Sequence, residues 1–311
     1  MRARENVVAN MEKACREVGL FNLVGHRLDP KLCQRARDLA RDFFSLPPEQ
    51  KAEIGMATDP LSGRGHQRLA ENTTYGRRDW HEAIDLYREI PERHPMLKNL
   101  ALQPGGKEEH LWPLLTKKNR WPQQIQGFAD FYDNYVAQML KLGEIVMRII
   151  ALGLRLPEDF FVPYIDESFW VMRLIGYPPL QTASGRKDIG ASCGEHTDYG
   201  LLTLVNQDPS EGSLEAQTVA GLWVGVPQVE NSLVTNIGDM LESLTGRHYR
   251  ATPHRVVHRL EQFRVSLPFF FEPNFDAKIA PIESIANSSG FPETMYGQYL
   301  YDRVSRNFSF E

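Results

Sequence analysis

Apolar residues recur at helical spacing in three stretches of the chain. The first two stretches cover residues 5–18 and 30–45, and they end at Gly19 and Pro47, residue types that commonly terminate helices. The third covers about 126–154 and carries one apolar stripe along its length. The pattern therefore predicts two amphipathic helices near the N-terminus and one long helix that packs along one side against a core.

The rest of the apolar pattern is typical of β-structure. Residues 169–177 form one predicted strand, which Pro178 closes, and residues 20–24 form a shorter one between the first two helices. The later short apolar segments are Leu201–Gln207, Leu214–Gln217, Leu222–Val226, Ser232–Asn236, His254–Val257 and Phe263–Phe271. Many short strands at such spacing predict a closed antiparallel barrel or jelly roll, so the expected fold class is α+β, mainly β, with flanking helices.

Three stretches show little periodicity and are expected to be loops or surface linkers. They cover residues 55–80, 91–122 and 180–192. The first contains a cluster of polar and aromatic residues, namely Tyr75, Arg77, Arg78, Trp80 and His81. Two interpretations of this cluster stay open: a lid or substrate-contacting loop, and a surface loop with an aromatic anchor.

These elements divide the chain of 311 residues into four regions. Residues 1–122 form an N-terminal region of helices and loops that contributes strands, and residues 123–164 contain the long packing helix. Residues 165–275 form the β-rich core. Residues 276–311 form a C-terminal helical segment, which either covers the mouth of the barrel or only packs against it.

The composition narrows the class of protein. Hydrophobic residues make up 42% of the chain and charged residues 24%, which is typical of a folded soluble protein. The formal net charge is −5 and there is no long basic run, which argues against nucleic acid as the main partner. No apolar run approaches the roughly 20 residues of a membrane-spanning helix. We therefore expect neither a nucleic acid nor a membrane as the partner.

The three cysteines, Cys15, Cys33 and Cys193, show no spacing typical of a metal site or a disulfide framework. Reduced thiols of this kind indicate a cytoplasmic location. Cys193 stands three residues before His196 and could line a site there. The favoured interpretation is a small buried hydrophobic residue.

Candidate chemistry begins at His196 and Asp198, which are two residues apart. In a β-strand their side chains project to the same face, with Cα atoms roughly 6.5 Å apart. A second imidazole could come from His254 or, on residue type alone, from His258. Two histidines and one aspartate on one face of a metal form the facial triad suited to non-haem Fe(II) and oxygen chemistry.

Arg264 and Ser266 repeat this spacing on a strongly apolar strand. An arginine offers a planar fork of donors and the serine adds a hydroxyl, so the pair is suited to hold a carboxylate. An arginine on a core strand also needs a partner, and an acidic ligand would be one. The pair therefore predicts a carboxylate receptor.

Together these motifs resemble the iron(II)/2-oxoglutarate-dependent dioxygenases of the isopenicillin-N-synthase-like superfamily. The matching pieces, in the same order and spacing, are Gly194-Glu-His-Thr-Asp-Tyr-Gly, Gln207-Asp208, Asn236-Ile-Gly-Asp-Met-Leu, His254-Arg-Val-Val and Arg264-Val-Ser-Leu-Pro-Phe-Phe. The resemblance implies the double-stranded β-helix, a jelly-roll form, for the barrel. It also implies that the iron ligands are His196, Asp198 and His254, rather than His258.

The resemblance further implies the chemistry. Fe(II), O2 and the co-substrate 2-oxoglutarate would oxidise a small molecule, in most cases by hydroxylation, with release of succinate and CO2. Arg264 and Ser266 would hold the distal carboxylate of 2-oxoglutarate, and Tyr177 would also contact this co-substrate. Arg173 shares a strand face with Tyr177 and would contact either ligand.

Residues near the motifs are expected to form walls of the substrate site. These candidates are Tyr199, directly after Asp198, and Phe269 or Phe271. A specific hypothesis is that Arg173 and Tyr199 recognise a small polar substrate. The substrate itself and the choice between hydroxylation, desaturation and demethylation stay open.

The N-terminal region resembles the same superfamily, with two departures. Gly19-Leu-Phe, Gly25-His26-Arg27 and Phe43-Phe-Ser-Leu-Pro47 stand where the family has a strand, a His-Gly turn and a Phe-Phe-x-Leu-Pro ending. Arg27 replaces the usual glycine. The strand that normally precedes the first helix is absent, so we expect a missing edge strand.

Three other functions compete with the oxygenase. Some members of the family use the same triad without 2-oxoglutarate, as oxidases or cyclases. A non-catalytic binding protein on the same barrel is a second alternative, although such proteins usually lose one of the ligands. A zinc hydrolase would use the two histidines and the aspartate, but it would leave Arg264 unexplained.

Overall fold

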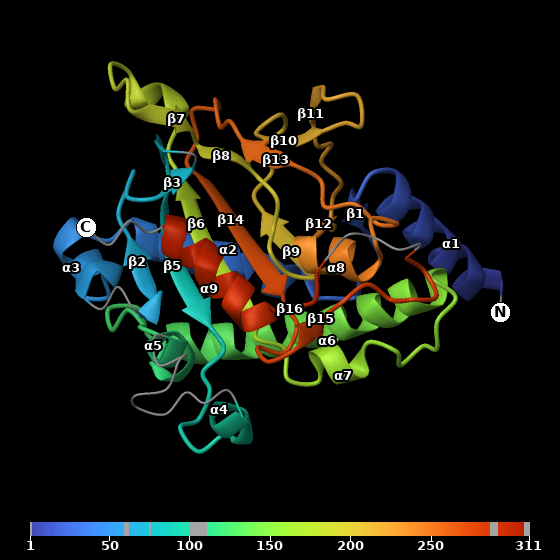
Figure 1. Cartoon of the computed structure of the whole chain (residues 1–311). Helices are drawn as coiled ribbons and strands as arrows, with labels where there is room; N and C mark the ends of the chain where they lie inside the picture. The colour runs from blue at the N-terminus through green and yellow to red at the C-terminus, as the bar shows by residue number, and fades with distance from the viewer. Residues whose placement is uncertain (1, 59–61, 75, 100–110, 287–291, 308–311) are drawn as a thin grey trace.

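The computed structural model describes residues 2–58, 62–74, 76–99, 111–286 and 292–307. Its α-helices are α1 (Arg2–Glu17), α2 (Pro30–Phe44), α3 (Pro48–Ala52), α4 (Pro95–Asn99), α5 (Trp112–Thr116), α6 (Phe128–Gly153), α7 (Val162–Ile165), α8 (Asp239–Leu244) and α9 (Tyr296–Asn307). Short 3-10 helices are η1 (Met56–Thr58) and η4 (Leu180–Ala183). Figure 1 shows these helices around a large β-sheet.

The β-strands form one major sheet and several smaller ones. The major sheet has the order β1 (Leu20–Leu23), β12 (Leu233–Ile237), β9 (Leu202–Gln207), β14 (Arg264–Phe271), β6 (Val171–Tyr177), β5 (Glu82–Tyr87) and β2 (Gly65–Gln67). The minor sheet has the order β11 (Trp223–Gly225), β10 (Leu214–Gln217), β13 (His254–Val256) and β8 (Cys193–His196). The remaining strands are β3 (Thr73–Thr74), β4 (Arg77–Asp79), β7 (Ile189–Ala191), β15 (Lys278–Ile279) and β16 (Thr294–Met295).

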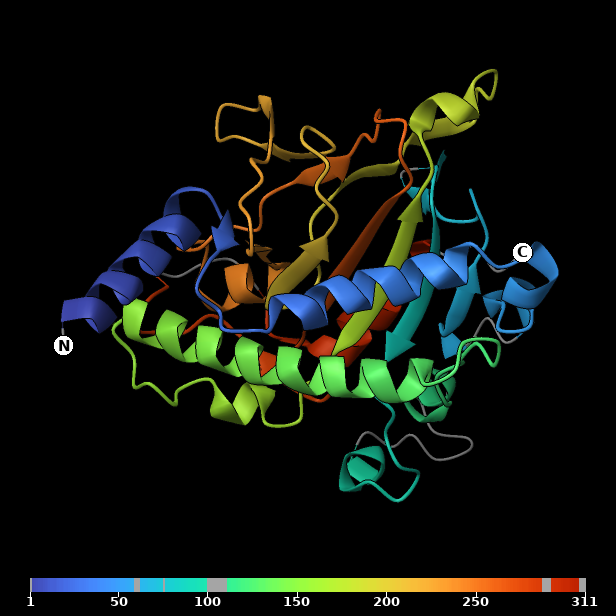
Figure 2. The same cartoon turned by 180° about the vertical axis from the view of Figure 1, so that it is seen from behind.

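Helices α2 and α6 lie side by side across one face of the major sheet (Figure 2). The contact of α6 with β14 is so close that only glycine fits at position 143. A Cβ atom on Gly143 would lie 2.3 Å from Cδ2 of Phe271. The Tyr132 hydroxyl of α6 donates a hydrogen bond of 2.6 Å to the Ala36 carbonyl of α2. These helices therefore cover one face of the major sheet, and the candidate site lies on the other face.

A second, smaller hydrophobic cluster joins the major and minor sheets. Its buried residues come from both sheets and include Ile175, Tyr177, Leu214, Val234 and Val256. Side chains that alternate along the strands therefore serve two cores, one under the helices and one between the sheets. This is the architecture of a double-stranded β-helix with flanking helices, as the family resemblance implied.

The predicted helices and core strands are confirmed, but the loop prediction for residues 55–80 is wrong. Strands β2 and β4 lie in this stretch, and β2 is fully buried at the edge of the major sheet. Its buried side chains are polar: Nε2 of His66 lies 2.9 Å from Oε2 of Glu82, and Gln67 donates to Asp85. Because polar pairs replace apolar residues here, the alternation that marks a strand is missing.

The other two loop predictions need smaller corrections. Residues 180–192 contain η4 and the strand β7, which pairs in parallel with β4. Residues 91–122 contain α4 and α5, and part of this range lies outside the described residues. The N-terminal region supplies β1, β2 and β5 to the major sheet. None of the described helices is long and apolar enough to cross a membrane.

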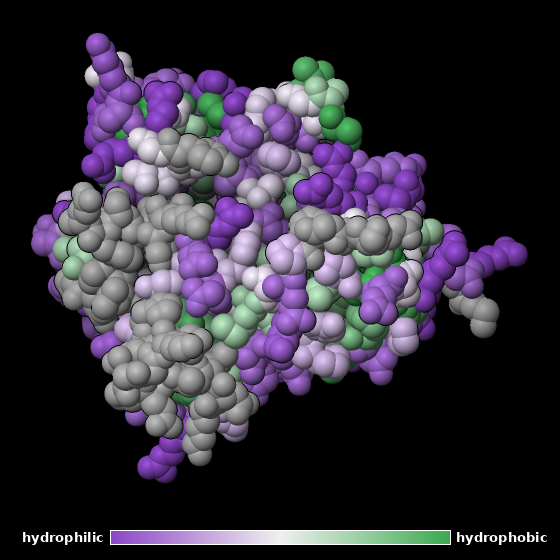
Figure 3. Space-filling model, viewed as in Figure 1, coloured by the Kyte–Doolittle hydropathy of each residue, from purple (hydrophilic) through white to green (hydrophobic). Residues whose placement is uncertain are grey.

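A projecting apolar feature lies on the face of the molecule shown in Figure 3. Figure 3 shows hydrophobic residues at the end of the β10–β11 hairpin, where Val219, Leu222 and Val224 are exposed. The hairpin belongs to the minor sheet and lies beyond the core that joins the two sheets. It therefore forms part of the outer surface and not of the candidate site.

Candidate active site

The minor sheet brings His196 and His254 together. The two residues are direct partners on the neighbouring strands β8 and β13, and their ring centroids lie 4.4 Å apart. Oδ1 of Asp198 lies 3.6 Å from Nε2 of His196 and 3.7 Å from Nε2 of His254. The three ligand atoms all lie within 4.8 Å of one another, which is a distance a single ion can bridge.

One detail of the prediction for this group is wrong. Strand β8 ends at His196, so Asp198 lies beyond the strand and not on it. The pairing of β8 with β13 shifts its register between His254 and Val256, which marks a β-bulge or irregularity. The Asp198 carbonyl accepts a hydrogen bond of 2.7 Å from the Asp239 amide, which fixes this turn against the start of α8. The convergence therefore depends on the turn and not on strand alternation.

Backbone carbonyl groups orient both imidazoles. Nδ1 of His196 lies 2.8 Å from the Gly194 carbonyl oxygen, and Nδ1 of His254 lies 3.0 Å from that of Thr252. A carbonyl oxygen only accepts, so each Nδ1 carries the proton and each Nε2 offers its lone pair toward Asp198. Such carbonyl partners are typical of metal-ligating histidines.

Asp198 is oriented in the same way. Its Oδ2 atom accepts hydrogen bonds from the Thr203 hydroxyl and, at 2.7 Å, from the Asn236 amide, which leaves Oδ1 to face the imidazoles. Burial disfavours the carboxylate, but the two histidines and these two donors outweigh burial and hold the pKa of Asp198 below its ordinary value. The Asp198 carboxylate is therefore ionised, and its Oδ1 atom faces the two imidazoles.

His258, the alternative third ligand, lies elsewhere. Its side chain is buried, with Nδ1 at 3.0 Å from the Ser213 hydroxyl and Nε2 at 2.7 Å from the Gln262 carbonyl oxygen. Both ring nitrogens are engaged, so the geometry selects His254 over His258.

Arg264 is buried at the start of β14, with a relative exposure of 2%. Its Nε donates a hydrogen bond of 2.7 Å to the Ser210 hydroxyl, its Nη2 donates to the Gln207 side chain, and its guanidinium lies 4.8 Å from the centre of the Tyr177 ring. Nη1 is buried and has no hydrogen-bond partner among the described residues. Burial lowers the pKa of Arg264, although the nearby Tyr177 and Asp208 oppose this shift. No carboxylate among the described residues forms an ion pair with this buried cation.

A cavity of about 450 Å³ opens beside the His-Asp-His group. His196 and Asp198 line it together with residues from the major sheet, the Thr73–Thr74 segment and α9. Its other polar and aromatic walls include Asp85, Arg173, Cys193, Phe270, Glu272 and Arg303. The cavity therefore gives a small molecule access to His196 and Asp198 of this group.

Two of the predicted substrate residues line this cavity. Arg173 does so while its Nε donates a hydrogen bond of 2.6 Å to the buried carboxylate of Asp85, so its charge is already balanced inside the protein. Tyr199 packs edge-on against Tyr299 of α9, and the guanidinium of Arg303 lies 5.9 Å from its ring centre. The structure thus places both residues at the site and gives Arg173 a structural partner as well.

The prediction for Phe269 and Phe271 is wrong. Both side chains are fully buried on the helix-facing side of β14, where Phe269 stacks on Trp170 and Phe271 meets α6. Phe270, on the opposite face, lines the cavity. Side chains alternate along a strand, so the face of β14 that carries Arg264 and Ser266 also carries the other even-numbered residues. Phe269 and Phe271 are odd-numbered and therefore point to the opposite face.

Glu272 follows on the cavity side directly after β14. It has a relative exposure of 2%, and its Oε2 atom has no hydrogen-bond partner among the described residues. Burial raises the pKa of Glu272 to about 8. Gly200 leaves the space that this carboxylate occupies, because a Cβ atom on Gly200 would lie 1.6 Å from Oε2.

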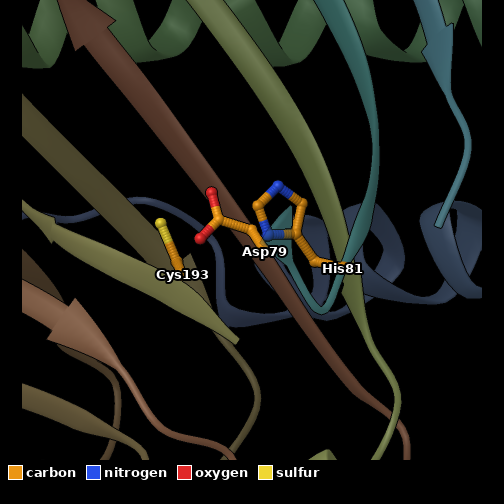
Figure 4. A group of neighbouring side chains, drawn as sticks. All are labelled: Asp79, His81 and Cys193. Carbon is orange, nitrogen blue, oxygen red and sulfur yellow. The ribbon is translucent and has the colours of Figure 1, made fainter. Parts of the chain in front are cut away.

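A second group of potential ligands consists of Asp79, His81 and Cys193 (Figure 4). The Asp79 carboxylate accepts hydrogen bonds from Asn72, Thr74 and the Gly194 amide. Nδ1 of His81 lies 2.7 Å from the Ser192 carbonyl oxygen. Because these bonds hold the strand that carries His196, the group acts as its scaffold.

Both interpretations of Cys193 find support. Its side chain is partly buried and packs against the hydrophobic cluster between the two sheets, and it also lines the cavity, with Sγ 3.9 Å from Nδ1 of His196. Within the predicted polar-aromatic cluster, Trp80 and His81 are buried, while Tyr75 lies outside the described residues.

The residues that position the predicted site residues were not identified from the sequence. Thr203 and Asn236 hold Asp198, and Gln207 holds Arg264. Gln207 and Asn236 belong to the motifs that carry the family resemblance, which was the available signal. Thr203 had none, because its role depends on the pairing of strand β9 with β12.

Comparisons with known proteins agree with this geometry. A family described as 2OG-Fe(II) oxygenase superfamily matches residues 168–273, and one described as non-haem dioxygenase in morphine synthesis N-terminal matches residues 2–124. A homoarginine-6-hydroxylase of Arabidopsis thaliana is 37% identical over 97% of this chain and 90% of its own length. One of Glycine max is 39% identical over 97% of this chain and 89% of its own length.

Solved structures are similar over nearly the whole chain. A full-length Neurospora crassa protein in complex with α-ketoglutarate and 5-formyluracil has a TM-score of 0.80 at 25% identity, and the match covers 98% of this chain and 91% of that one. A 2OG-Fe(II) oxygenase family protein of Caulobacter crescentus has a TM-score of 0.80 at 26% identity, with coverage of 98% and 95%.

Proposed function

Because this chain belongs to the 2OG-Fe(II) oxygenase superfamily, and is thus an iron(II)- and 2-oxoglutarate-dependent oxygenase, we propose that it hydroxylates a small amino acid with a cationic side chain, such as homoarginine. The observation that carries the proposal is its identity of 37–39% to homoarginine-6-hydroxylases over 97% of the chain. The cavity supports it, since carboxylate and guanidinium groups both line the walls.

We infer that His196, Asp198 and His254 hold the iron. Their donor set fits Fe(II), because two neutral imidazoles and one carboxylate leave part of the coordination sphere open. Each side chain is locked by a second hydrogen bond away from the centre. The bound iron and 2-oxoglutarate supply the oxidation of a C–H bond, with release of succinate and CO2. The protein fixes where that chemistry takes place.

Arg264, Ser266 and Tyr177 are assigned to the distal carboxylate of 2-oxoglutarate. The unpartnered Nη1 of the buried Arg264 supports this assignment, since a carboxylate would supply both the missing acceptor and the missing charge. Gln207 and Ser210 hold the guanidinium plane in place. The co-substrate then binds in one register.

The substrate binds in the cavity beside Asp198. Tyr199 and Phe270 form apolar walls there, and α9 covers one side with Leu300 and Arg303. These side chains exclude water from the reacting carbon and restrict its position. A small molecule in this cavity, rather than a polymer, is the expected partner.

The test is a turnover assay with Fe(II), 2-oxoglutarate and a panel of amino acids. We expect homoarginine to give a product heavier by one oxygen atom, together with an equal amount of succinate. The panel includes lysine and arginine as other cations and norleucine as a neutral control. Asp198→Ala, which removes a metal ligand, serves as the inactive control.

Two other results would contradict the proposal. Product formation without 2-oxoglutarate would favour an oxidase, and turnover of neutral amino acids alone would reject the cationic substrate. A cytoplasmic location, and the lack of a nucleic-acid or membrane partner, stay predictions. Cell fractionation would test the location. Pull-downs with and without nuclease and detergent would test the two partner predictions.

A further inference from the structure

We propose that Glu272 binds the cationic end of the substrate and thereby selects the carbon that is hydroxylated. This inference rests on the proposed function, and it names the residue that would make a cationic amino acid the preferred substrate. No motif in the sequence marks Glu272, because it lies one residue beyond the strand that carries Arg264 and Ser266.

The first argument is position. Glu272 lines the same cavity as His196 and Asp198. It also lies directly against Gly200, the second residue after Asp198, where even a methyl group would collide with Oε2. A group bound to Glu272 therefore lies next to the turn that carries the metal-binding aspartate.

The second argument is the lack of a counter-ion. The other buried acids of the major sheet are paired: Asp85 with Arg173 at 2.6 Å, and Glu82 with Lys51 at 2.7 Å. Among the described residues, Glu272 has no such ion pair, and its Oε2 has no hydrogen-bond donor. The Tyr296 hydroxyl lies beside this carboxyl group, but it carries no charge. A buried carboxylate without a counter-ion is costly, and a cationic ligand would supply the charge and further donors.

The third argument is chemical fit. A guanidinium group presents two parallel N–H donors that match the two oxygens of a carboxylate. In homoarginine, carbon 6 is the methylene bonded to the guanidino group. A guanidinium held by Glu272 would therefore bring this methylene, rather than a carbon near the α-amino group, toward the metal-binding side chains.

The opposite end of such a substrate also finds a suitable group. Arg303 lines the cavity from α9, its side chain is exposed, and its guanidinium lies 5.0 Å from the ring centre of Tyr299. An exposed cation and a buried carboxyl group on one cavity complement an amino acid whose carboxylate enters last.

The test compares two substrates of nearly equal shape in the wild type and in Glu272→Gln. Homoarginine carries the charged guanidinium, and homocitrulline replaces it with a neutral urea. We expect kcat/KM for homoarginine to fall on the order of 100-fold in Glu272→Gln, as for a buried charge pair that loses one partner. We expect kcat/KM for homocitrulline to stay the same or rise.

Further variants separate recognition from folding. Glu272→Asp keeps the carboxyl group on a side chain that is shorter by one methylene, and it should retain part of the preference for homoarginine. Gly200→Ala should displace the Glu272 carboxylate and reduce the same preference. Glu144→Gln removes a similar charge from the exposed face of α6 and should change neither substrate. The 2-oxoglutarate affinity of each variant shows whether its site is intact.

The outcomes for the two proposals differ. Equal losses for homoarginine and homocitrulline in Glu272→Gln would mean a structural role and would overturn the inference about Glu272. Unchanged kinetics would overturn it too, while the proposed function would stand. If the wild type hydroxylated neutral amino acids and no cationic one, both the proposed function and the role of Glu272 would be rejected.

Discussion

The burial of Glu272 predicts a specific pH dependence of stability. The pKa of this carboxyl group is about 8 in the folded protein and 4.5 as its ordinary value, so the folded state binds more protons between these two values. The free energy of unfolding therefore decreases as the pH rises from 4.5 to about 8. Below this window the contribution is fully present, and above it the contribution is lost.

The size of the effect follows from the same two values. They differ by about 3.5, and one pKa unit corresponds to about 1.36 kcal/mol, so the full effect is at most about 5 kcal/mol. Glu272→Gln removes the titration. Relative to the wild type, the variant should gain stability by up to this amount as the pH rises through the window.

Urea unfolding of the metal-free, substrate-free protein measures this difference. Midpoints and slopes would be compared for the wild type, Glu272→Gln and the surface control Glu144→Gln at about pH 5, 7 and 9. Groups that do not face Glu272 titrate equally in all three proteins, so the difference reports on Glu272 together with its neighbours Tyr296, Asp198 and Asp239. Parallel pH profiles for the wild type and Glu272→Gln would refute the idea that a buried, unpaired carboxyl group occupies this position.

Three further predictions follow from the contacts of the site and its support. Arg264→Ala should weaken 2-oxoglutarate binding on the order of 100-fold, as measured by KM for the co-substrate, and an unchanged KM would assign the carboxylate elsewhere. Asn236→Ala should lower Fe(II) affinity about 10-fold or more in a metal titration, because Asp198 loses a donor that aims it; equal affinity would contradict this role. Gly143→Ala should lower stability by about 1–3 kcal/mol in urea unfolding, because its Cβ would collide with Phe271; higher stability would mean that the helix gains more from alanine than it loses in packing.

The sequence predicted the fold where hydrophobic periodicity was strong. The long helix α6 and the strands β6, β9 and β14 bury apolar side chains on one face, and their bounds lie close to the expected ones. Strand β2 was missed because its buried residues are polar and reach their partners on β5. A strand that is buried with hydrogen-bonded polar side chains shows no alternation of apolar and polar residues in the sequence.

The candidate site shows a similar limit. His196, Asp198, His254 and Arg264 were identified from spacing and family resemblance, and the structure brings the first three together. The rest depends on which strands are neighbours. Thr203 reaches Asp198 across the turn, a contact that no spacing rule provides.

Alternation along β14 also separates Phe270 from its two phenylalanine neighbours. Strand alternation had placed Arg264 and Ser266 on one face of β14, and the same rule assigns Phe270 to that face and Phe271 to the helices. Phe269 and Phe271 were predicted from their nearness to the motif, without this rule. Applied consistently, alternation would have pointed to Phe270 and to Glu272 as cavity residues.

The most direct test of the account is visible absorption of the anaerobic protein with Fe(II), before and after addition of 2-oxoglutarate. The account predicts a charge-transfer band in the wild type that requires both additions. It predicts that the band is lost in Asp198→Ala, because the three ligand atoms act together. A band of equal strength in Asp198→Ala, or iron binding with no band in the wild type, would contradict the claim that His196, Asp198 and His254 form the oxygenase centre.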